Sequence, residues 1–340
     1  MFEALLEIFE IHSLGSLQIS LLAVLPELFL FLAISVLLLV GSSYSTSKRH
    51  GYPMLVKPIA WITIFALGLA FLLVLNNPIP HQIIFSGALI VDNFTNFIKA
   101  VVLLSSIACL AVSLDYIKQE RIHAFEYSVL ILFAVVGMLL LVSSYDLITL
   151  YLAIEMVSLS SYVLATFKRQ SAFSTEAGLK YFILGAFSSG LLLFGSSMVY
   201  GLTGTTNFGQ ISQYLTGTSG NPELISTGLV IGVLFIGMAL LFKATAAPFH
   251  MWAPDVYEGA PTIVSTFFAV VPKIAILGLF IRLFMFSFYD LVGFWQQLLV
   301  FSSLTSMVLA ALIALKQRKL KRFFAYSSVG HVGYLLVGFS

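Results

Sequence analysis

Ten apolar stretches occupy most of this 340-residue chain, and each is long enough to cross a lipid bilayer as a helix. A helix rises about 1.5 Å per residue, so about 20 residues cross the roughly 30 Å of hydrocarbon. Inside the hydrocarbon, backbone polar groups need partners within the protein, and a helix supplies them locally. The predicted spans are residues 22–41, 57–75, 93–113, 124–143, 146–167, 177–200, 226–247, 262–286, 293–315 and 323–340. The sequence therefore predicts an all-α polytopic membrane protein with about ten transmembrane helices.

The composition excludes several classes of protein. With 59% hydrophobic and 9% charged residues, the chain is too apolar for a soluble domain. Its single cysteine, Cys109, provides neither a disulfide framework nor a cysteine metal site. The sequence has no metal-ligand spacing, nucleotide-binding loop or nucleophile–base motif, so we expect no cofactor in this chain. Residues 1–18 contain glutamates but no lysine or arginine, which is typical of neither a signal peptide nor a transit peptide.

The distribution of basic residues predicts the orientation of the chain. Lysine and arginine follow spans one, three, five and nine, whereas the links after spans two, four, six and eight have none. Loops on the cytoplasmic or matrix side carry an excess of basic residues. This alternation therefore predicts that the odd-numbered links share that side and that both chain ends lie on the other. The residues concerned are Lys48, Arg49, Lys57, Lys118, Arg121, Lys168, Arg169, Lys316, Arg318, Lys319, Lys321 and Arg322.

Lys243 lies in an otherwise uncharged apolar run, residues 225–247. A lysine in the hydrocarbon region costs about 2.5–3.5 kcal/mol, so it indicates an ion or proton path. Pro248 follows closely, removes a backbone donor and leaves the carbonyl of Ala244 without its helical partner. The stretch from Pro248 to Pro254 therefore predicts a broken helix, a form of backbone that membranes tolerate only beside protein or a wet cavity.

Two further ionisable residues lie near the centres of apolar spans. Glu155, within 146–167, has no charged residue within a turn, so it must be protonated or must meet a cation from another helix. Its other interpretation is a neutral, hydrogen-bonded glutamate that joins helices. Lys273 directly follows Pro272 and is too deep to reach either interface. It either forms a structural pair or belongs to a path for ions.

Glu176 and Lys180 are four residues apart on one predicted helix, so they share a face and can pair. The pair either begins the helix at the interface, or Lys180 passes a proton inward from the basic side. The small residues from Gly185 to Gly190 predict the close approach of a neighbouring helix. His250 and His331 can exchange a proton near neutral pH, so each is either a relay or a packing residue.

Three charged residues receive other interpretations. Arg282, near the end of its span, is expected to extend to the interface. Lys99 either does the same or remains inside the membrane. Glu27 follows Pro26 near a helix start, where a carboxylate is favoured by the helix dipole, and is taken as structural.

These groups suggest a mechanism. A lysine in a dry site holds its proton weakly, and a nearby carboxylate strengthens that hold. Movement of Glu155 toward or away from Lys243 would therefore load or unload the amine. Lys273 and the two histidines, connected by water, could then carry charge sideways through the bundle. This remains a hypothesis at the level of sequence.

Four ordered motifs resemble the antiporter-like subunits of respiratory complex I. They are DLITLYLAIE at 146–155, EAGLKYFILGA at 176–186, and the stretches 242–261 and 320–334. The resemblance implies about fourteen helices built on two inverted five-helix repeats, each with a broken helix. It further implies that Glu155 is the carboxylate switch, Lys243 the broken-helix lysine and Lys273 the connecting lysine. By the same resemblance, His331 matches a histidine of the central polar axis.

The resemblance also sets the expected organisation. Residues 1–123 would form an N-terminal segment with helices 1–3, residues 124–286 the first repeat, and residues 287–340 the start of the second. The remaining helices would come from a separate polypeptide, or the chain is truncated. The other partners expected are membrane-arm subunits of complex I and membrane lipids. NADH, FMN, iron–sulfur clusters and ubiquinone are expected in partner subunits.

Two other functions stay open at this stage. A cation/proton antiporter subunit uses the same kind of helix bundle, and a structural membrane subunit would use its charges only to hold helices together. The expected location is the mitochondrial inner membrane, with the bacterial plasma membrane as the alternative.

Overall fold

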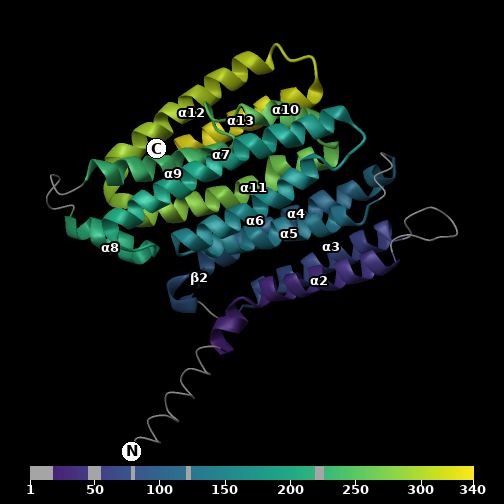
Figure 1. Cartoon of the computed structure of the whole chain (residues 1–340), viewed down its shortest axis with the longest axis horizontal. Coiled ribbons are helices and arrows are strands. Elements are labelled where there is room, and N and C mark those ends of the chain that lie inside the picture. The colour runs from purple at the N-terminus through teal and green to yellow at the C-terminus, as the bar shows by residue number, and fades with distance from the viewer. Residues whose placement is uncertain (1–17, 45–54, 78–80, 120–123, 219–225) are drawn as a thin grey trace, which may run out of the picture.

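In the computed structural model, residues 18–44, 55–77, 81–119, 124–218 and 226–340 are described, and long helices run alongside one another (Figure 1). The helices are α2 (Leu25–Tyr44), α3 (Val56–Leu75), α4 (Asn93–Gln119), α5 (Glu126–Ser143), α6 (Leu147–Ala165), α7 (Ala172–Thr203), α8 (Phe208–Thr218), α9 (Thr227–Ala244), α10 (Trp252–Gly259), α11 (Thr262–Arg282), α12 (Val292–Ala314) and α13 (Leu320–Val337). Short helical segments within the described residues are the 3-10 helices η1 (Phe85–Gly87) and η4 (Tyr289–Leu291) and the π-helix η3 (Leu283–Ser287). The strands are β1 (His81–Ile84) and β2 (Leu89–Asp92).

The predicted fold class is confirmed. Within the described residues, nine helices are long and apolar enough to cross a membrane. The tenth predicted span, 323–340, does form a helix, α13, but α13 is not among the nine. Its first turn contains Lys321 and Arg322, and His331 lies further along, which makes it less apolar than the others. The chain is a multi-pass membrane protein.

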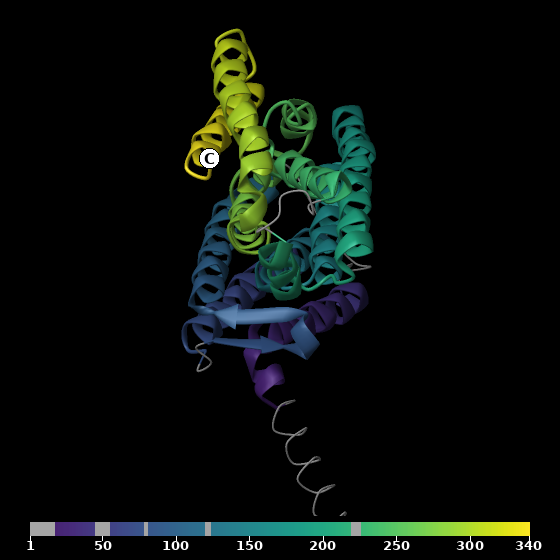
Figure 2. The same cartoon turned by 90° about the vertical axis from the view of Figure 1, so that its left-hand side faces the viewer.

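The β-hairpin between α3 and α4 was not predicted. β1 and β2 are antiparallel, with His81 opposite Asp92 and Ile84 opposite Leu89. The tight connection between them uses positive φ angles at Phe85, Ser86 and Gly87. The hairpin lies across the end of the bundle that also carries α8 (Figures 1 and 2). The side chain of Asn207 donates a hydrogen bond to the carbonyl of Gly87 at 2.9 Å and ties the hairpin to the start of α8.

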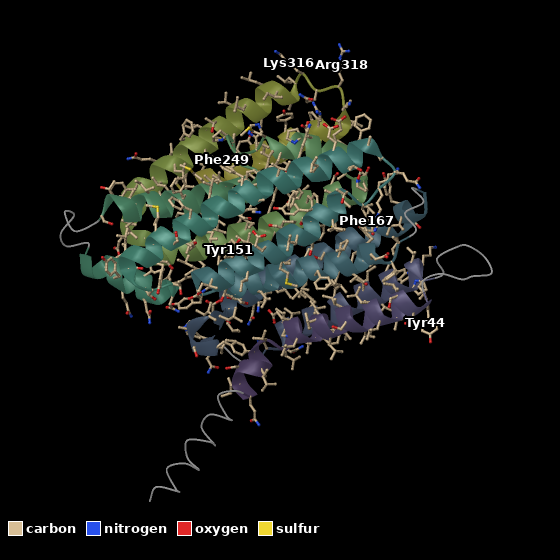
Figure 3. The ribbon with its side chains drawn as sticks, in the orientation of Figure 1. Tyr44, Tyr151, Phe167, Phe249, Lys316 and Arg318 are labelled. Atoms are coloured by element: carbon tan, nitrogen blue, oxygen red, sulfur yellow. The ribbon has the colours of Figure 1, made fainter. Side chains whose placement is uncertain are left out.

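The described basic links share the opposite end of the bundle. Figure 3 shows Lys316 and Arg318 at the end where Tyr44 and Phe167 also lie. Successive long helices are antiparallel, so the alternation of basic and non-basic links places the basic ones together. Lys48, Arg49 and Arg121 lie outside the described residues, as does the side chain of Lys118.

Helix α5 lies at the centre of the bundle, and most of its residues are buried between neighbouring helices. Helices α7 and α9 approach closely because both carry glycine at the crossing. A Cβ atom added at Gly195 would lie 2.6 Å from the carbonyl oxygen of Gly232. Small residues at such crossings bring helix backbones together in a membrane, where packing drives association. This crossing fixes the helix that carries Lys243 against α7.

Candidate functional site

The predicted broken helix is present. Helix α9 ends at Ala244 and α10 begins at Trp252. The backbone amide of Ala247 donates to the hydroxyl of Ser306 at 2.7 Å, and the carbonyl of Ala247 accepts from the hydroxyl of Ser302 at 2.7 Å. Both serines belong to α12, so a neighbouring helix satisfies backbone groups that the break leaves without helical partners.

The two prolines of this region differ in place. Pro248 lies within the break, whereas Pro254 lies in the first turn of α10. A proline is tolerated in the first turn because the amide it lacks would have no helical partner there. The break therefore ends before Pro254, which is earlier than the sequence predicted.

Lys243 lies in the last turn of α9 and extends into the bundle between α6 and α7. Its amine donates to the hydroxyl of Ser158 on α6 at 2.8 Å and to that of Ser189 on α7 at 3.4 Å. The amine is also 5.9 Å from the ring centre of Tyr162. The Lys243 amine thus has neutral partners on two helices.

Glu155 lies one turn before Ser158 on α6. One of its carboxylate oxygens is buried and has no hydrogen-bond partner among the described residues. The ion pairs found within 4.0 Å in the described part of the chain do not include one between Glu155 and Lys243. Glu155 therefore lies near Lys243 in the structure, but the two side chains form no ion pair among the described contacts.

Lys273 lies on α11, with a residue exposure of 7%. Its amine donates to the hydroxyl of Ser328 on α13. Lys273, Ser328 and His331 line one cavity of about 630 Å³ between these two helices. The predicted connecting lysine and the predicted histidine of α13 therefore share one space.

His250 lies within the break. Its Nδ1 is buried and has no hydrogen-bond partner among the described residues. Its ring lies edge-on to Tyr326 of α13, with 6.1 Å between the ring centres. The contacts found for the described residues join His250 to α13 but not to Lys243 or Lys273.

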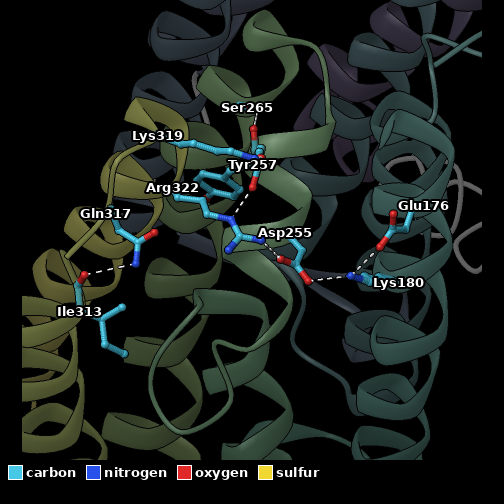
Figure 4. A network of polar contacts seen from close by, with 10 residues as sticks. Glu176, Lys180, Asp255, Tyr257, Ser265, Ile313, Gln317, Lys319 and Arg322 are labelled. Atoms are coloured by element: carbon cyan, nitrogen blue, oxygen red, sulfur yellow. Dashed lines mark hydrogen bonds and ion pairs between the residues drawn. The ribbon is translucent and has the colours of Figure 1, made fainter. Parts of the chain in front are cut away.

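An ion-pair network occupies the basic end of the bundle (Figure 4). The predicted pair of Glu176 and Lys180 is present at 2.8 Å, and Lys180 also contacts Asp255 at 2.8 Å. Arg322 of α13 contacts the other oxygen of Asp255 at 2.6 Å. Asp255 therefore joins α10 to both α7 and α13.

Glu258 extends this network one turn further along α10. It pairs with Lys319 and Arg322. Burial opposes ionisation of Glu258, but the hydrogen bonds from Lys319 and Arg322 outweigh it and hold the pKa of this carboxyl below its ordinary range. Together these residues line a cavity of about 180 Å³ that also contains Lys180 and Asp255.

Sequence reasoning did not identify Asp255 and Glu258 as site residues. They are three residues apart, so they share a face of α10. The signal available was the concentration of basic residues at 316–322, with which acidic residues near the same end of the bundle can pair.

The predictions for Arg282 and Lys99 need correction or refinement. Arg282 does not extend to the interface: its side chain is 8% exposed and pairs with Asp92 at 2.8 Å. Burial opposes ionisation of Asp92, but hydrogen bonds from Thr95 and Arg282 hold the pKa of Asp92 below its ordinary range. Lys99 also stays inside, where it pairs with Glu27 at 2.6 Å. Each cation finds a carboxylate on another element, which sequence spacing could not reveal.

Close approach of a neighbouring helix was predicted for the small residues from Gly185 to Gly190 on α7. Of the two glycines, Gly185 lies against a neighbouring helix and Gly190 does not. A Cβ atom added at Gly185 would lie 2.2 Å from the hydroxyl oxygen of Tyr162, whereas Gly190 faces open space. Gly185 therefore allows α7 to pack on α6 beside the Lys243 amine.

Comparison with known proteins supplies the family. Residues 144–340, more than half of the chain, match the NADH:quinone oxidoreductase/Mrp antiporter transmembrane family. The chain belongs to this family. The resemblance to antiporter-like subunits is thereby confirmed.

Individual relatives agree with this assignment. The chain is 53% identical over 323 residues to NADH-ubiquinone oxidoreductase chain 2 of Marchantia polymorpha, covering 94% of this chain and 65% of that protein. It is 44% identical over 320 residues to NADH-quinone oxidoreductase subunit N of Paramagnetospirillum magneticum, covering 94% and 64%. The chain thus spans just under two thirds of the length of these relatives.

Solved structures show the same fold. A chain of respiratory complex I from Thermus thermophilus superposes with a TM-score of 0.74 at 29% identity, covering 92% of this chain and 63% of that one. A chain of the Mrp complex from Dietzia superposes with a TM-score of 0.73 at 20% identity, covering 94% and 59%. The second likeness concerns the fold alone.

Proposed function

We propose that this chain is a membrane-arm subunit of respiratory complex I and that it translocates protons. The observation that carries the proposal is the position of the Lys243 amine, which lies inside the bundle at a helix break and whose hydrogen-bond partners among the described residues are both hydroxyls. An amine held in this way can give up and regain a proton without separating from a fixed carboxylate. The names and structures of the relatives supply the complex in which it would act.

The proposed path runs from the basic end toward the middle of the bundle. Lys180, held by Glu176 and Asp255 in the network of Figure 4, would receive protons from the basic side. Lys243 would be the next group, with its proton controlled by Glu155. The geometry that supports this order is the packing of α7, which carries Lys180, against α9, which carries Lys243.

Beyond Lys243, the proposed path continues to Lys273 and the cavity of about 630 Å³ beside it. His250 and His331 would act as relays, because His250 contacts α13 and His331 lies on it, and an imidazole can both donate and accept a proton. The division into repeats at 124–286 and 287–340 stays a prediction.

In this proposal the redox reaction takes place elsewhere. NADH oxidation and ubiquinone reduction, with FMN and iron–sulfur clusters, would belong to partner subunits. The partners of this chain would be other membrane-arm subunits and lipids. The proposed location is the mitochondrial inner membrane, since plant relatives named NADH-ubiquinone oxidoreductase chain 2 are 47%, 48% and 53% identical to this chain.

The test uses the intact complex in sealed vesicles. We expect Glu155→Gln to lower the number of protons pumped per NADH oxidised at least several-fold, because the variant removes the charge that controls Lys243. Lys316→Ala, which changes an exposed residue at the basic end, is the control and should pump as the unmodified complex does. Unchanged pumping in Glu155→Gln would contradict the proposal. Loss of assembly together with normal pumping in the complexes that do form would favour a structural subunit.

The antiporter alternative predicts a different ion. The family description includes Mrp antiporters, so sodium-dependent transport by the purified complex would favour that function. Proton transport that depends on NADH and does not change with sodium concentration would favour the proposal.

A further inference from the structure

Two serine hydroxyls accept hydrogen bonds from the Lys243 amine, and the function proposed above does not assign them a role. Ser158 comes from α6 and Ser189 from α7, and both residues are buried. We call these two residues the hydroxyl cradle. Because they belong to different helices, the position of the amine depends on the packing of three helices together.

The hydroxyls differ from carboxylates in the hydrogen bonds that they can form. A hydroxyl has one donor and two acceptor lone pairs, whereas an ionised carboxylate only accepts. A hydroxyl can therefore accept from an ammonium group and can also donate to the neutral amine that remains after the proton leaves. The cradle can hold Lys243 in both protonation states.

The remaining contacts of Ser158 define its role further. Its hydroxyl donates to the carbonyl of Ile154, one turn earlier in α6, at 2.7 Å. The hydroxyl hydrogen is thus used within the helix, and the oxygen lone pairs face the Lys243 amine. Ser158 therefore acts as an acceptor, which favours the charged form of the amine. The described contacts of Ser189 leave its hydroxyl free to accept or donate.

The position of Ser158 relative to Glu155 adds the link to proton control. The two residues are three apart on α6, so they are neighbours on the helix surface. One oxygen of Glu155 is buried and lacks a hydrogen-bond partner among the described residues. The hydroxyl partner of the amine and the predicted carboxylate switch therefore lie one turn apart on α6.

We propose that Ser158 and Ser189 are positioning residues that hold the Lys243 amine during proton exchange and set how strongly it retains its proton. This inference rests on the proposed function, since it presumes that Lys243 exchanges protons. It adds the residues that determine the pH range in which the exchange works.

The test is the pH dependence of proton pumping in the intact complex, expressed per NADH oxidised. In Ser158→Ala the ammonium loses an acceptor, so the alkaline limb of the profile should move to lower pH by roughly one unit or more. Ser158→Thr keeps the hydroxyl and should restore the original profile. Ser160→Ala is the matched control, because Ser160 lies on the same helix and donates only to the carbonyl of Met156 among its described contacts.

A second pair of variants covers the case in which Ser158→Ala fails to assemble. Ser158→Cys nearly keeps the side-chain size but offers a weaker partner, so a smaller shift in the same direction is expected. Ser189→Ala should shift the profile less than Ser158→Ala, because its contact with the amine is longer.

The possible results separate the two proposals. Unshifted profiles in Ser158→Ala or Ser158→Cys, combined with lost pumping in Lys243→Ala, would overturn the role of the cradle and leave the proposed function intact. Full pumping in Lys243→Ala would overturn the proposed function itself.

Discussion

Two pairs of basic side chains lie within apolar helices of this protein, and they differ in their partners. Lys99 and Arg282 each contact a carboxylate, at 2.6 Å and 2.8 Å. Lys243 and Lys273 each contact hydroxyls instead. Lys99 lies on α4, and Arg282 lies on α11, which packs against α4. Lys243 lies beside the helix break, and Lys273 lies beside the cavity next to α13.

The difference indicates which charges can exchange protons. A carboxylate partner stabilises the protonated cation, and separating the pair would leave a buried charge without compensation. A hydroxyl partner is compatible with either protonation state. Among these four buried cations, the partner rather than the sequence position therefore separates the structural side chains from those that can exchange protons.

The largest effect on stability is expected at the paired lysine. Lys99→Met leaves Glu27 buried without its cation and should destabilise the folded chain by about 3–5 kcal/mol. The double variant Glu27→Gln with Lys99→Met should recover most of this loss, because no buried charge remains. Denaturation of the detergent-solubilised complex, measured for both single variants and the double variant, gives the coupling energy. Additive losses would show that the pair does not stabilise the bundle.

The opposite pattern is expected at a lysine held by a hydroxyl. Lys273→Met should reduce proton pumping several-fold while leaving stability unchanged or raised, since it removes a buried amine that has no carboxylate partner among the described residues. Pumping and thermal stability of the same preparation measure the two effects. A large loss of stability in this variant would remove the distinction between the two pairs.

A smaller effect is expected at the basic end. Asp255→Asn removes one of two carboxylate partners from Lys180, which keeps Glu176, and from Arg322, which keeps Glu258. Because these pairs are partly exposed, only a small loss of stability is expected. Because Asp255 joins α10 to α7 and α13, pumping should fall by a factor of a few and become less sensitive to salt. Pumping measured at low and high ionic strength in Asp255→Asn tests this. A variant that pumps normally at both would show that the junction has no role.

The smallest effect is the pH dependence of Glu258. Its pKa is held below the ordinary value, so its pairs with Lys319 and Arg322 contribute stability above the unfolded pKa of about 4.3. That contribution is lost as the pH falls through the lower, folded pKa. The free energy of unfolding, measured as a function of pH, should therefore differ between the unmodified complex and Glu258→Gln at neutral pH. The two values should converge in strong acid. Identical curves would contradict the assignment.

Much of the fold follows from the sequence because the membrane imposes simple rules. Long apolar runs predicted the crossing helices, and Pro248 after Lys243 predicted the break. The hairpin before α4 was missed because strands of four residues leave almost no periodic signal. The hydropathy of α13 was overestimated because the predicted span began at residue 323, whereas the helix begins at Leu320 and includes Lys321 and Arg322.

The candidate site was predicted less completely because partners come from distant parts of the chain. Glu155, Lys243 and Lys273 were visible as charges in apolar surroundings. The hydroxyl partners were not, since serine is common in membrane helices and gives no separate signal. The interpretation of Arg282 failed because Asp92, its partner, is 190 residues away in sequence.

The measurement that most directly tests the central claim is the ratio of protons pumped to NADH oxidised in two variants of the intact complex. One is Lys243→Ala, and the other is the double variant Glu27→Gln with Lys99→Met. We predict that the ratio falls in the first and is retained in the second, because Lys243 is held by hydroxyls and exchanges protons whereas Lys99 is held by a carboxylate and does not. A ratio that is retained in Lys243→Ala would contradict the account.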